Sequence, residues 1–364
     1  MKLLFFVVMC KSGLSMERYI DILSHFPILN EVESVETFGS GHINDTFKVK
    51  VDDTQYILQR VNHHVFKNVK GLTDNIIKVT AYISKHLRDT DMQTLQFFPT
   101  FEGEFIVQDA SGDYWRLMQF VEGSKVFDLV DNKSVAFSGG KAYGWFVKML
   151  KDFTAETLID TIPDFHNIDF RLSNFRQAVR KDKVGRLKEV TLEVDFVEKR
   201  AEEMRKILLA GEAGEIPLRV THNDTKISNV LFNEKDEAIC VIDLDTVMPG
   251  YVLYDFGDAI RTFTNTAKED EKDLSKVTIN MDYYKAFAQG FLSETQDILS
   301  PKELELLPFS ARFMAYIMGL RFLTDYLDGD PYYKVEYTGH NLVRAKGQFR
   351  LLEEMEKNEL NMRI

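Results

Sequence analysis

The feature that most constrains the fold is a change in the spacing of apolar residues near residue 125. Between residues 32 and 121, apolar side chains recur mostly at every second position between turn-forming residues, which is typical of short β-strands. After about residue 126 they recur at helical spacing, interrupted by one strand-like island from Leu218 to Val241. We therefore expect an α+β chain with a small antiparallel-sheet lobe over residues 16–121 and a large, mostly helical lobe over residues 122–364.

The same spacing predicts the individual elements. In the first lobe we expect strands at residues 35–38, 46–51, 55–61, 104–108 and 114–121 and a helix at 72–88, and Met16 opens another. In the second lobe we expect helices near residues 139–155, 168–182, 192–209, 281–293, 301–325 and 340–358. A junction between two such lobes is a usual place for a ligand.

Charge and cysteine content exclude several classes of protein. The 57 acidic side chains outnumber the 45 basic ones, the formal net charge is −12, and no long basic run is present. An acidic surface repels a phosphate backbone, so we expect no nucleic-acid partner. The only cysteines, Cys10 and Cys240, are too few for a disulfide framework or a thiolate zinc site, which favours a reducing, cytoplasmic setting. No obligate protein partner is evident.

The first ten residues, MKLLFFVVMC, resemble the beginning of a signal peptide. The apolar run from Leu3 to Cys10 is much shorter than the roughly 20 residues that a membrane-spanning helix needs, so we expect no membrane association. The following KSGLSM contains no small-residue cleavage site of the usual kind. We interpret residues 1–15 as a candidate upstream extension.

The strongest candidate site is the polar stretch inside the strand-like island. It contains His222, Asp224, Lys226 and Asn229, and the next strand leads to Asp243. Phosphoryl transfer requires a group that accepts the hydroxyl proton and oxygen ligands that hold magnesium on the phosphates. The spacing Asp-x-Lys-x-x-Asn is typical of a kinase catalytic loop, so Asp224 and Lys226 are candidate catalytic residues and Asn229 and Asp243 candidate magnesium ligands. The alternative is a polar loop in which these side chains only stabilise turns.

A glycine-containing turn in the first lobe is a candidate phosphate contact. Gly39 and Gly41 lie in FGSGHINDT between two predicted strands, and glycines let backbone amides approach phosphates. The match to a full G-x-G-x-x-G is incomplete, so an ordinary hairpin turn is the alternative.

The third strand of a kinase lobe usually carries a lysine that pairs with the phosphates. Here that strand reads YILQR and has no lysine, which leaves Arg60 or a neutral contact by Gln59 as substitutes. At the end of the first lobe, MQFVEG could place the backbone of Gln119 and Val121 against an adenine edge. The alternative there is an ordinary strand end followed by a glycine turn.

Taken together, these residues resemble a known superfamily. The segments THNDTKISNVLF and VIDLDTVMPGYVLYDFGDAIR are similar to those of the aminoglycoside phosphotransferase and choline kinase superfamily, which has a protein-kinase-like two-lobe fold. Within it, the chain most resembles the bacterial N-acetylhexosamine 1-kinases over nearly its whole length after about residue 17. The segments that carry this likeness are GHINDTF, YILQRVN, IPLRVTHNDTK, IDLDTVMPG, DFGDAIR, EDEKDLSKV, ELLPFS, RFLTDYLDGDPYY and HNLVRAKGQ.

The resemblance implies phosphorylation of N-acetylglucosamine or N-acetylgalactosamine at the anomeric hydroxyl, dependent on ATP and Mg²⁺, giving the sugar 1-phosphate. It also implies that Asp224 is the catalytic base, that Asn229 and Asp243 bind magnesium, and that Arg321 and Tyr332 contact the sugar. The alternative for Arg321 is an ion pair with an acidic neighbour such as Asp325, four residues further along the same helix.

Two other functions remain open from the sequence. One is a kinase for a different hydroxyl acceptor, such as an aminoglycoside, choline or homoserine. Arg321 near the predicted acceptor argues mildly against a cationic substrate. The other is a module that binds nucleotide without transfer, which only the missing third-strand lysine supports and which Asp224, Asn229 and Asp243 oppose.

Overall fold

The computed structural model describes residues 16–28, 30–39, 43–88 and 90–364, so the candidate extension, residues 1–15, lies outside it. The chain divides into two compact units. Unit 1 comprises the residues up to Arg88 together with Gln93–Ser124, and unit 2 comprises Asp89–Met92 together with Lys125–Ile364.

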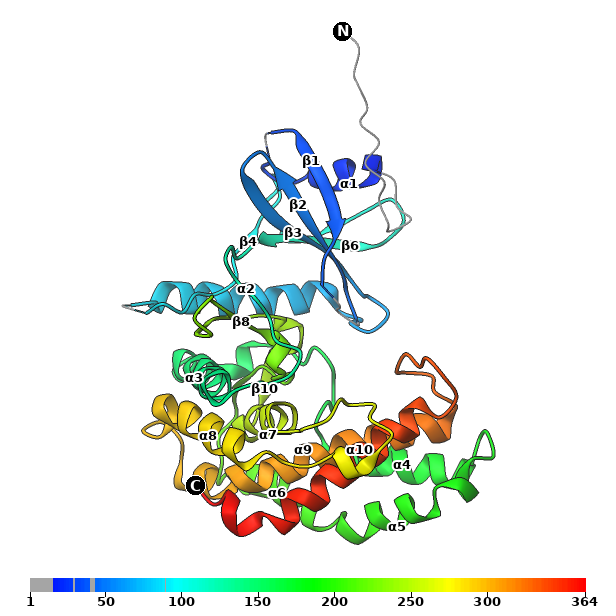
Figure 1. Ribbon diagram of the computed structural model, residues 1–364. Helices are drawn as coiled ribbons and strands as arrows, with labels where there is room; N and C mark the ends of the chain where they lie inside the picture. The colour runs from blue at the N-terminus through cyan, green and yellow to red at the C-terminus, as the bar shows by residue number, and fades with distance from the viewer. Residues whose placement is uncertain (1–15, 29, 40–42, 89) are drawn as a thin grey trace. The chain divides into compact units, whose positions relative to one another are not determined.

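Unit 1 contains a six-stranded sheet in which every pairing is antiparallel (Figure 1). Its strands are β1 (Val32–Thr37), β2 (Asp45–Val51), β3 (Thr54–Val61), β4 (Phe97–Phe98), β5 (Val107–Gln108) and β6 (Tyr114–Gln119). Their order is β1-β2-β3-β6-β4, and β5 also pairs with β6. Two helices belong to this unit, α1 (Met16–Leu23) and α2 (Val69–His86). The predicted strand at 104–108 is therefore reduced to two residues.

Apolar side chains of the sheet pack against α1. The ring of Tyr19 in α1 lies 5.1 Å from that of Phe47 and meets Trp115 edge-on at 6.0 Å. These three side chains and Leu58 are almost completely removed from solvent. Because strand residues alternate between faces, the apolar alternation seen in the sequence corresponds to one buried face here.

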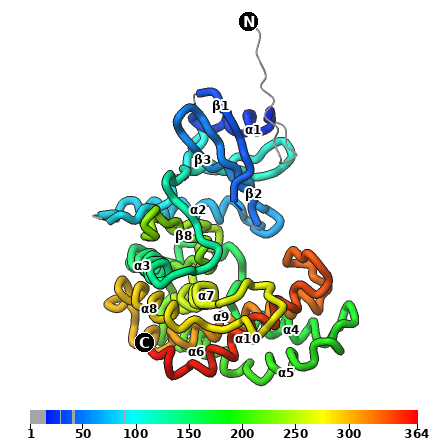
Figure 2. The backbone as a smooth tube through the Cα atoms, in the orientation of Figure 1, coloured from blue at the N-terminus to red at the C-terminus, as the bar shows by residue number. Residues whose placement is uncertain are grey.

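Unit 2 is built mainly of helices, with two short strand pairs. The helices are α3 (Lys133–Met149), α4 (Ile168–Lys181), α5 (Thr191–Arg200), α6 (Lys206–Glu212), α7 (Val252–Phe263), α8 (Met281–Thr295), α9 (Pro301–Asp328) and α10 (His340–Lys357). Helix α9 packs against α7, α10 and α4, and α3 lies side by side with α8 (Figure 2). The helix predicted at 192–209 is in fact α5 and α6, separated by a short 3₁₀ turn at Glu203–Arg205.

The strand-like island forms the two strand pairs. Strand β7 (Arg219–Thr221) pairs with β10 (Met248–Gly250), and β8 (Val230–Phe232) pairs with β9 (Ala238–Val241), both antiparallel. The polar stretch singled out in the sequence connects β7 to β8. Both ends of this stretch are therefore fixed by strand pairing.

Helix α7 is buried on all sides, since every residue in it except Thr262 is buried. At Gly257 the helix backbone touches α9: a Cβ atom at this position would lie 2.3 Å from the carbonyl oxygen of Ser310. Only glycine allows this approach without a shift of one helix. The polar residues Asp255, Asp258 and Arg261 recur every three residues on one face of α7, and this face is buried against the loop after β7 instead of facing solvent. This helix was not predicted from the sequence.

Helix α9 begins with a capping box. Ser300 accepts a hydrogen bond from the backbone N–H of Glu303, whose carboxylate accepts from that of Ser300. Glu303 also pairs with Arg219 of β7 at 2.7 Å, which ties the helix start to the strand before the polar stretch. Among the described helices, α9 alone is long and apolar enough to cross a membrane, but 83% of its most apolar window is buried, as in the core helix of a folded domain.

Candidate active site

The loop after β7 holds Asp224 between two partners. Lys226 Nζ lies 2.9 Å from Asp224 Oδ2. Asn229 Nδ2 donates to the same oxygen at 3.1 Å and to the Asp224 carbonyl at 2.8 Å. Burial would raise the pKa of Asp224, but the charge and hydrogen bond of Lys226 outweigh it and hold that pKa below its ordinary value. Asp224 is therefore ionised at neutral pH, as a proton acceptor must be.

His222 supports the loop from within the core. The backbone N–H of Asp224 donates to His222 Nδ1 at 3.3 Å, and His222 Nε2 lies 2.8 Å from the carbonyl oxygen of Ile242. Because a carbonyl can only accept, these partners assign the hydrogen to Nε2. The imidazole thus connects the loop that carries Asp224 to the residue before Asp243.

Two carboxylates of α7 anchor the loop backbone. Asp255 accepts the backbone N–H groups of His222 at 2.8 Å and Asn223 at 2.7 Å. Asp258 accepts the backbone N–H of Thr225 at 3.0 Å. Burial raises the pKa of Asp255 to about 6, while the hydrogen bonds from the loop oppose this rise. The position of Asp224 is therefore set by three backbone hydrogen bonds to one buried helix.

Asn229 and Asp243 offer the oxygen atoms expected of magnesium ligands. Both hydrogens of the Asn229 amide are directed at Asp224, so its Oδ1 points to the other side of the planar group. Asp243 follows β9 in the left-handed conformation, with φ of 60°, and its charge acts on Lys226. In the part of the chain that the structure describes, no group of three His, Cys, Asp or Glu side chains could hold a metal. One amide and one carboxylate oxygen fit Mg²⁺, which keeps several ligands from phosphates and water.

Arg321, the predicted sugar contact, lies on α9 among aromatic rings. Its guanidinium carbon is 4.7 Å from the centre of the Phe165 ring and 5.7 Å from that of Tyr333. The ion pair with Asp325 that the helical spacing allowed is not formed. Asp325 instead accepts the backbone N–H groups of Tyr332 at 2.9 Å and Tyr333 at 3.0 Å. These hydrogen bonds hold the segment after α9 close to Arg321.

The side chain of Tyr332, the other predicted sugar contact, is 56% exposed. Its ring meets that of Tyr333 edge-on at 4.8 Å. Tyr333, which the sequence reasoning did not single out, is the tyrosine that contacts the Arg321 guanidinium. Arg321 and Tyr332 thus belong to one cluster, with Tyr333 between them.

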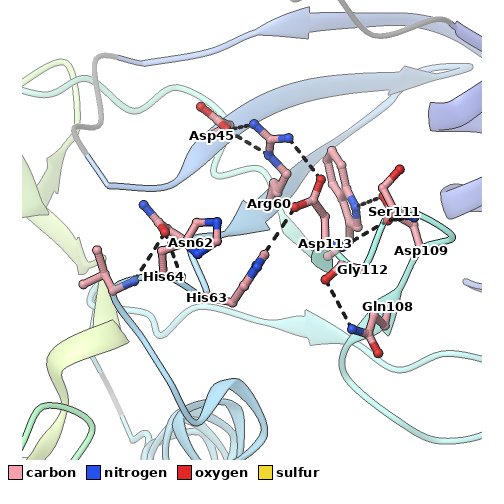
Figure 3. A network of polar contacts seen from close by, with 12 residues as sticks. Asp45, Arg60, Asn62, His63, His64, Gln108, Asp109, Ser111, Gly112 and Asp113 are labelled. Carbon is pink, nitrogen blue, oxygen red and sulfur yellow. Dashed lines mark hydrogen bonds and ion pairs between the residues drawn. The ribbon is translucent and has the colours of Figure 1, made fainter.

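In unit 1 the structure separates Gln59 from Arg60. The two residues are adjacent in β3, where Gln59 pairs with Arg116 of β6 and Arg60 pairs with Trp115 of β6. Because adjacent strand residues point to opposite faces, the Gln59 and Arg60 side chains lie on opposite faces of the sheet. Arg60 is held by ion pairs to Asp45 and to Asp113, the latter at 3.1 Å (Figure 3). It is therefore engaged by two carboxylates within its own unit.

Gln59 occupies the other face together with a buried arginine. It donates to Thr46 Oγ1 at 3.0 Å and accepts from Arg116 Nε at 2.9 Å. The side chain of Arg116 is 2% exposed and lies 5.7 Å from the centre of the Phe97 ring. Gln59 and Arg60 are the two candidates to replace the lysine expected on this strand. Of these, Gln59 lies with the polar side chains of Thr46 and Arg116, on the sheet face that does not pack against α1.

The other predicted nucleotide contacts also lie in unit 1. Gly39 has a φ of +76°, which glycine adopts at little cost. Gly41 lies outside the described residues. The backbone N–H of Gln119 donates to the carbonyl oxygen of Gln96 at 2.9 Å, and the Val121 carbonyl accepts from Ser124 Oγ at 2.6 Å.

Sequence reasoning missed Asp255 and Asp258 as anchors of the loop. A usable signal was present, because two carboxylates three residues apart in the mostly apolar segment VLYDFGDAIRTF need polar partners once they are buried. It also missed Arg171 and His166, which lie beside Arg321. No motif marks these two residues.

Comparison with known proteins agrees with this architecture. The family model described as the phosphotransferase enzyme family matches residues 34–291. A microcompartment-associated aminopropanol kinase is 15% identical with a TM-score of 0.61, covering 96% of this chain and 99% of its own. A spectinomycin phosphotransferase, solved with ADP and spectinomycin, is 11% identical with a TM-score of 0.60 and the same coverage. A Plasmodium vivax ethanolamine kinase is 15% identical with a TM-score of 0.55, covering 88% of this chain and 84% of its own. The predicted kinase-like fold is confirmed.

Proposed function

The chain belongs to the phosphotransferase enzyme family and is a small-molecule kinase, and from this premise we propose that it phosphorylates the anomeric hydroxyl of an N-acetylhexosamine. The phosphoryl donor is ATP and the product is the sugar 1-phosphate. The observation that carries the catalytic part of this proposal is the contact of Asp224 Oδ2 with Lys226 Nζ and Asn229 Nδ2, on a loop whose backbone is hydrogen-bonded to α7.

In the proposed reaction, the anomeric oxygen attacks the γ-phosphorus of ATP. A new O–P bond forms, the bond between the γ-phosphorus and the bridging oxygen breaks, and ADP leaves with that electron pair. The hydroxyl proton passes to a carboxylate oxygen of Asp224. An anomeric hydroxyl is more acidic than an ordinary alcohol because the ring oxygen withdraws electrons, so one aspartate suffices as the base. Lys226 keeps that aspartate ionised before the reaction.

Asn229 and Asp243 would hold magnesium, which would neutralise charge on the transferred phosphates. Gly39, Gly41, Gln59, Gln119 and Val121 are the proposed nucleotide contacts in unit 1. Arg60 stays in this set as the weaker candidate, because its ion pairs with Asp45 and Asp113 already satisfy its charge.

The acceptor assignment is supported by the surroundings of Arg321. Its planar guanidinium can donate two parallel hydrogen bonds to ring hydroxyls, and the phenol and apolar face of Tyr332 suit a sugar ring. We further propose that the protein acts in the cytoplasm, without a nucleic-acid, membrane or obligate protein partner.

The experiment is ADP release in magnesium buffer across N-acetylhexosamines, other free sugars, aminoglycosides and amino alcohols. We expect turnover of N-acetylglucosamine or N-acetylgalactosamine, with phosphorus coupled to the anomeric hydrogen in the NMR spectrum of the product. Asp224→Asn should lower turnover by roughly 10²–10⁴, the range for acid–base groups, while the exposed Asp282→Asn should leave it unchanged. A 6-phosphate product, or turnover only of amino alcohols, would contradict the proposal. ATP binding without any acceptor-dependent ADP would indicate a module that does not transfer.

A further inference from the structure

Two arginines of unit 2 meet at one aromatic residue. Arg171 of α4 donates Nε and Nη2 to the carbonyl oxygen of Phe165 at 3.1 Å and 3.0 Å. The Arg321 guanidinium of α9 lies 4.7 Å from the centre of the Phe165 ring. The helix packing of α4 on α9 brings the two cations together. Burial and then the charge of Arg321 lower the pKa of Arg171 to about 10, so the two guanidinium groups repel each other.

Neither cation is neutralised by a carboxylate. Within the described ranges of the chain, no ion pair is formed by Arg171 or Arg321. The nearby Asp164 acts on Arg171 only at a distance and instead accepts from Asn167 at 2.8 Å. Asp325, one turn from Arg321, is already used by the backbone of the following segment. By contrast, the buried Arg261 of α7 pairs with Asp258 at 2.7 Å.

A buried histidine provides the second observation. His166 is 5% exposed, and neither of its ring nitrogens has a hydrogen-bond partner in the part of the chain that the structure describes. The backbone of Asn223 is close to the ring but outside hydrogen-bond geometry. Burial, with the charges of Arg321 and Arg171, holds the pKa of His166 well below its usual range. The ring is therefore neutral, and the charge of Asp224 also reaches it.

We infer that Arg171, together with Arg321 and the unpartnered His166, forms an acceptor subsite that selects neutral or anionic polyhydroxyl acceptors and rejects acceptors carrying an ammonium group. Arg171 is the specificity-determining residue of this subsite. Its Nε and Nη2 are fixed on Phe165, which directs the remaining Nη1 as a donor toward hydroxyl or carboxylate oxygens. An ammonium group brought beside two uncompensated cations would be repelled.

This inference rests on the proposed function for the identity of the sugar, but its charge selectivity does not depend on which sugar is used. Two unit charges about 6 Å apart repel by an amount equivalent to about 3-fold to 100-fold in affinity, for effective dielectric constants from about 80 down to 20. An intermediate value, about tenfold per arginine, is expected because both guanidinium groups are only partly buried.

The test compares N-acetylglucosamine with glucosamine, which differ by an acetyl group that removes the amine charge. Assays below about pH 7 keep the amine mostly protonated, because an amine beside electron-withdrawing groups, such as a peptide α-amino group, has a pKa of about 7.7–8.0. We measure kcat/KM for both sugars in the parent protein, Arg171→Met, Arg171→Lys and Arg180→Met. Arg180 is an exposed arginine of the same helix, and nine residues of helix place it on the opposite face. A calorimetric titration of each sugar in the presence of a non-hydrolysable ATP analogue reports binding without turnover.

We expect the parent protein to prefer N-acetylglucosamine. Arg171→Met should reduce that preference about tenfold, while Arg180→Met should not change it. Arg171→Lys should still reject glucosamine, because the positive charge is kept, but it should lower kcat/KM for N-acetylglucosamine, because the planar donor is lost. This result would show that the charge at residue 171 is what excludes the ammonium group. A parent protein that accepts glucosamine equally well, or an unchanged preference in Arg171→Met, would overturn the inference. A third outcome separates the two proposals. If the protein rejects both sugars but phosphorylates another uncharged polyol and not the amino analogue of that polyol, the proposed sugar substrate is wrong, while the selection against ammonium groups is supported.

Discussion

Replacing Lys226 by methionine should make Asp224 titrate closer to neutral pH. In the parent protein the ammonium group lies 2.9 Å from Asp224 Oδ2 and offsets the burial that would otherwise raise the pKa of the carboxyl. Methionine is unbranched and nearly as long as lysine, but it carries no charge. The burial is then uncompensated, so protonation of the base begins at higher pH and the acid limb of kcat/KM moves upward.

The distance sets the expected size of this shift. The side chains of Lys226 and Asp224 are 40% and 23% exposed, so solvent screens their attraction. At 2.9 Å, effective dielectric constants of about 80 and 40 give about 1.4 and 2.9 kcal/mol. Since one pKa unit corresponds to about 1.36 kcal/mol, the acid limb should move up by about 1–2 pH units.

The assay is kcat/KM from about pH 4 to 9 for the parent protein, Lys226→Met, Lys226→Arg and Lys235→Met. Lys226→Arg retains the charge and should keep the limb near its original pH. Lys235, an exposed lysine in the β8–β9 turn, is the control for loss of a surface charge. An acid limb at the same pH in Lys226→Met and in the parent would refute the reasoning. If turnover of Lys226→Met is too slow, carbon NMR of the Asp224 carboxyl gives the same titration directly.

Three further predictions concern the support of the site. Asp255→Asn removes one of the two charge-assisted hydrogen bonds that Asp255 itself accepts from the loop. It should lower the free energy of unfolding in urea by about 1.5–3 kcal/mol, whereas the exposed Asp282→Asn should change it by less than about 0.5 kcal/mol. Gly257→Ala places a Cβ 2.3 Å from the Ser310 carbonyl and should cost about 1–3 kcal/mol, seen as a lower Tm; an unchanged Tm would contradict the close contact. Asp243→Ala should abolish transfer and weaken ATP binding in magnesium more than adenosine binding, and a rate that survives chelation of all divalent ions would contradict the assigned metal role.

The sequence was informative wherever one face of an element is buried and the other is solvated. The strands β2 and β3 and the helices α2, α4, α8 and α10 all lie close to the predicted ranges. The structure also brings together Asp224, Lys226 and Asn229, which the sequence spacing grouped, while their roles in catalysis and metal binding stay predictions. The spacing of apolar residues thus predicts the bounds of elements that have one buried and one solvated face.

The failures have a common physical origin, because they depend on packing between distant segments. The polar face of helix α7 is buried against a loop that is about 30 residues away in the sequence, so local spacing alone did not reveal what this face contacts. The alternative raised for Arg321, an ion pair with Asp325, depended on such packing: Asp325 accepts backbone N–H groups of the segment after α9, and Arg321 lies beside Phe165. Arg60 could not be distinguished from Gln59 until the sheet register placed them on opposite faces.

The contact between Gly257 and Ser310 also sets the distance between the two helices that hold Asp224 and Arg321. The loop that contains Asp224 is hydrogen-bonded to Asp255 and Asp258 of α7, which lie on either side of Gly257. Arg321 lies on α9 eleven residues after Ser310, which is about 16 Å along the helix at 1.5 Å per residue. A change in the spacing of these two backbones would therefore move Asp224, the proposed base, relative to Arg321, the proposed acceptor contact. Acceptor preference can thus be retuned, or lost, through residues that touch neither substrate, and laboratory evolution of this enzyme should select substitutions along this helix crossing as well as around the acceptor.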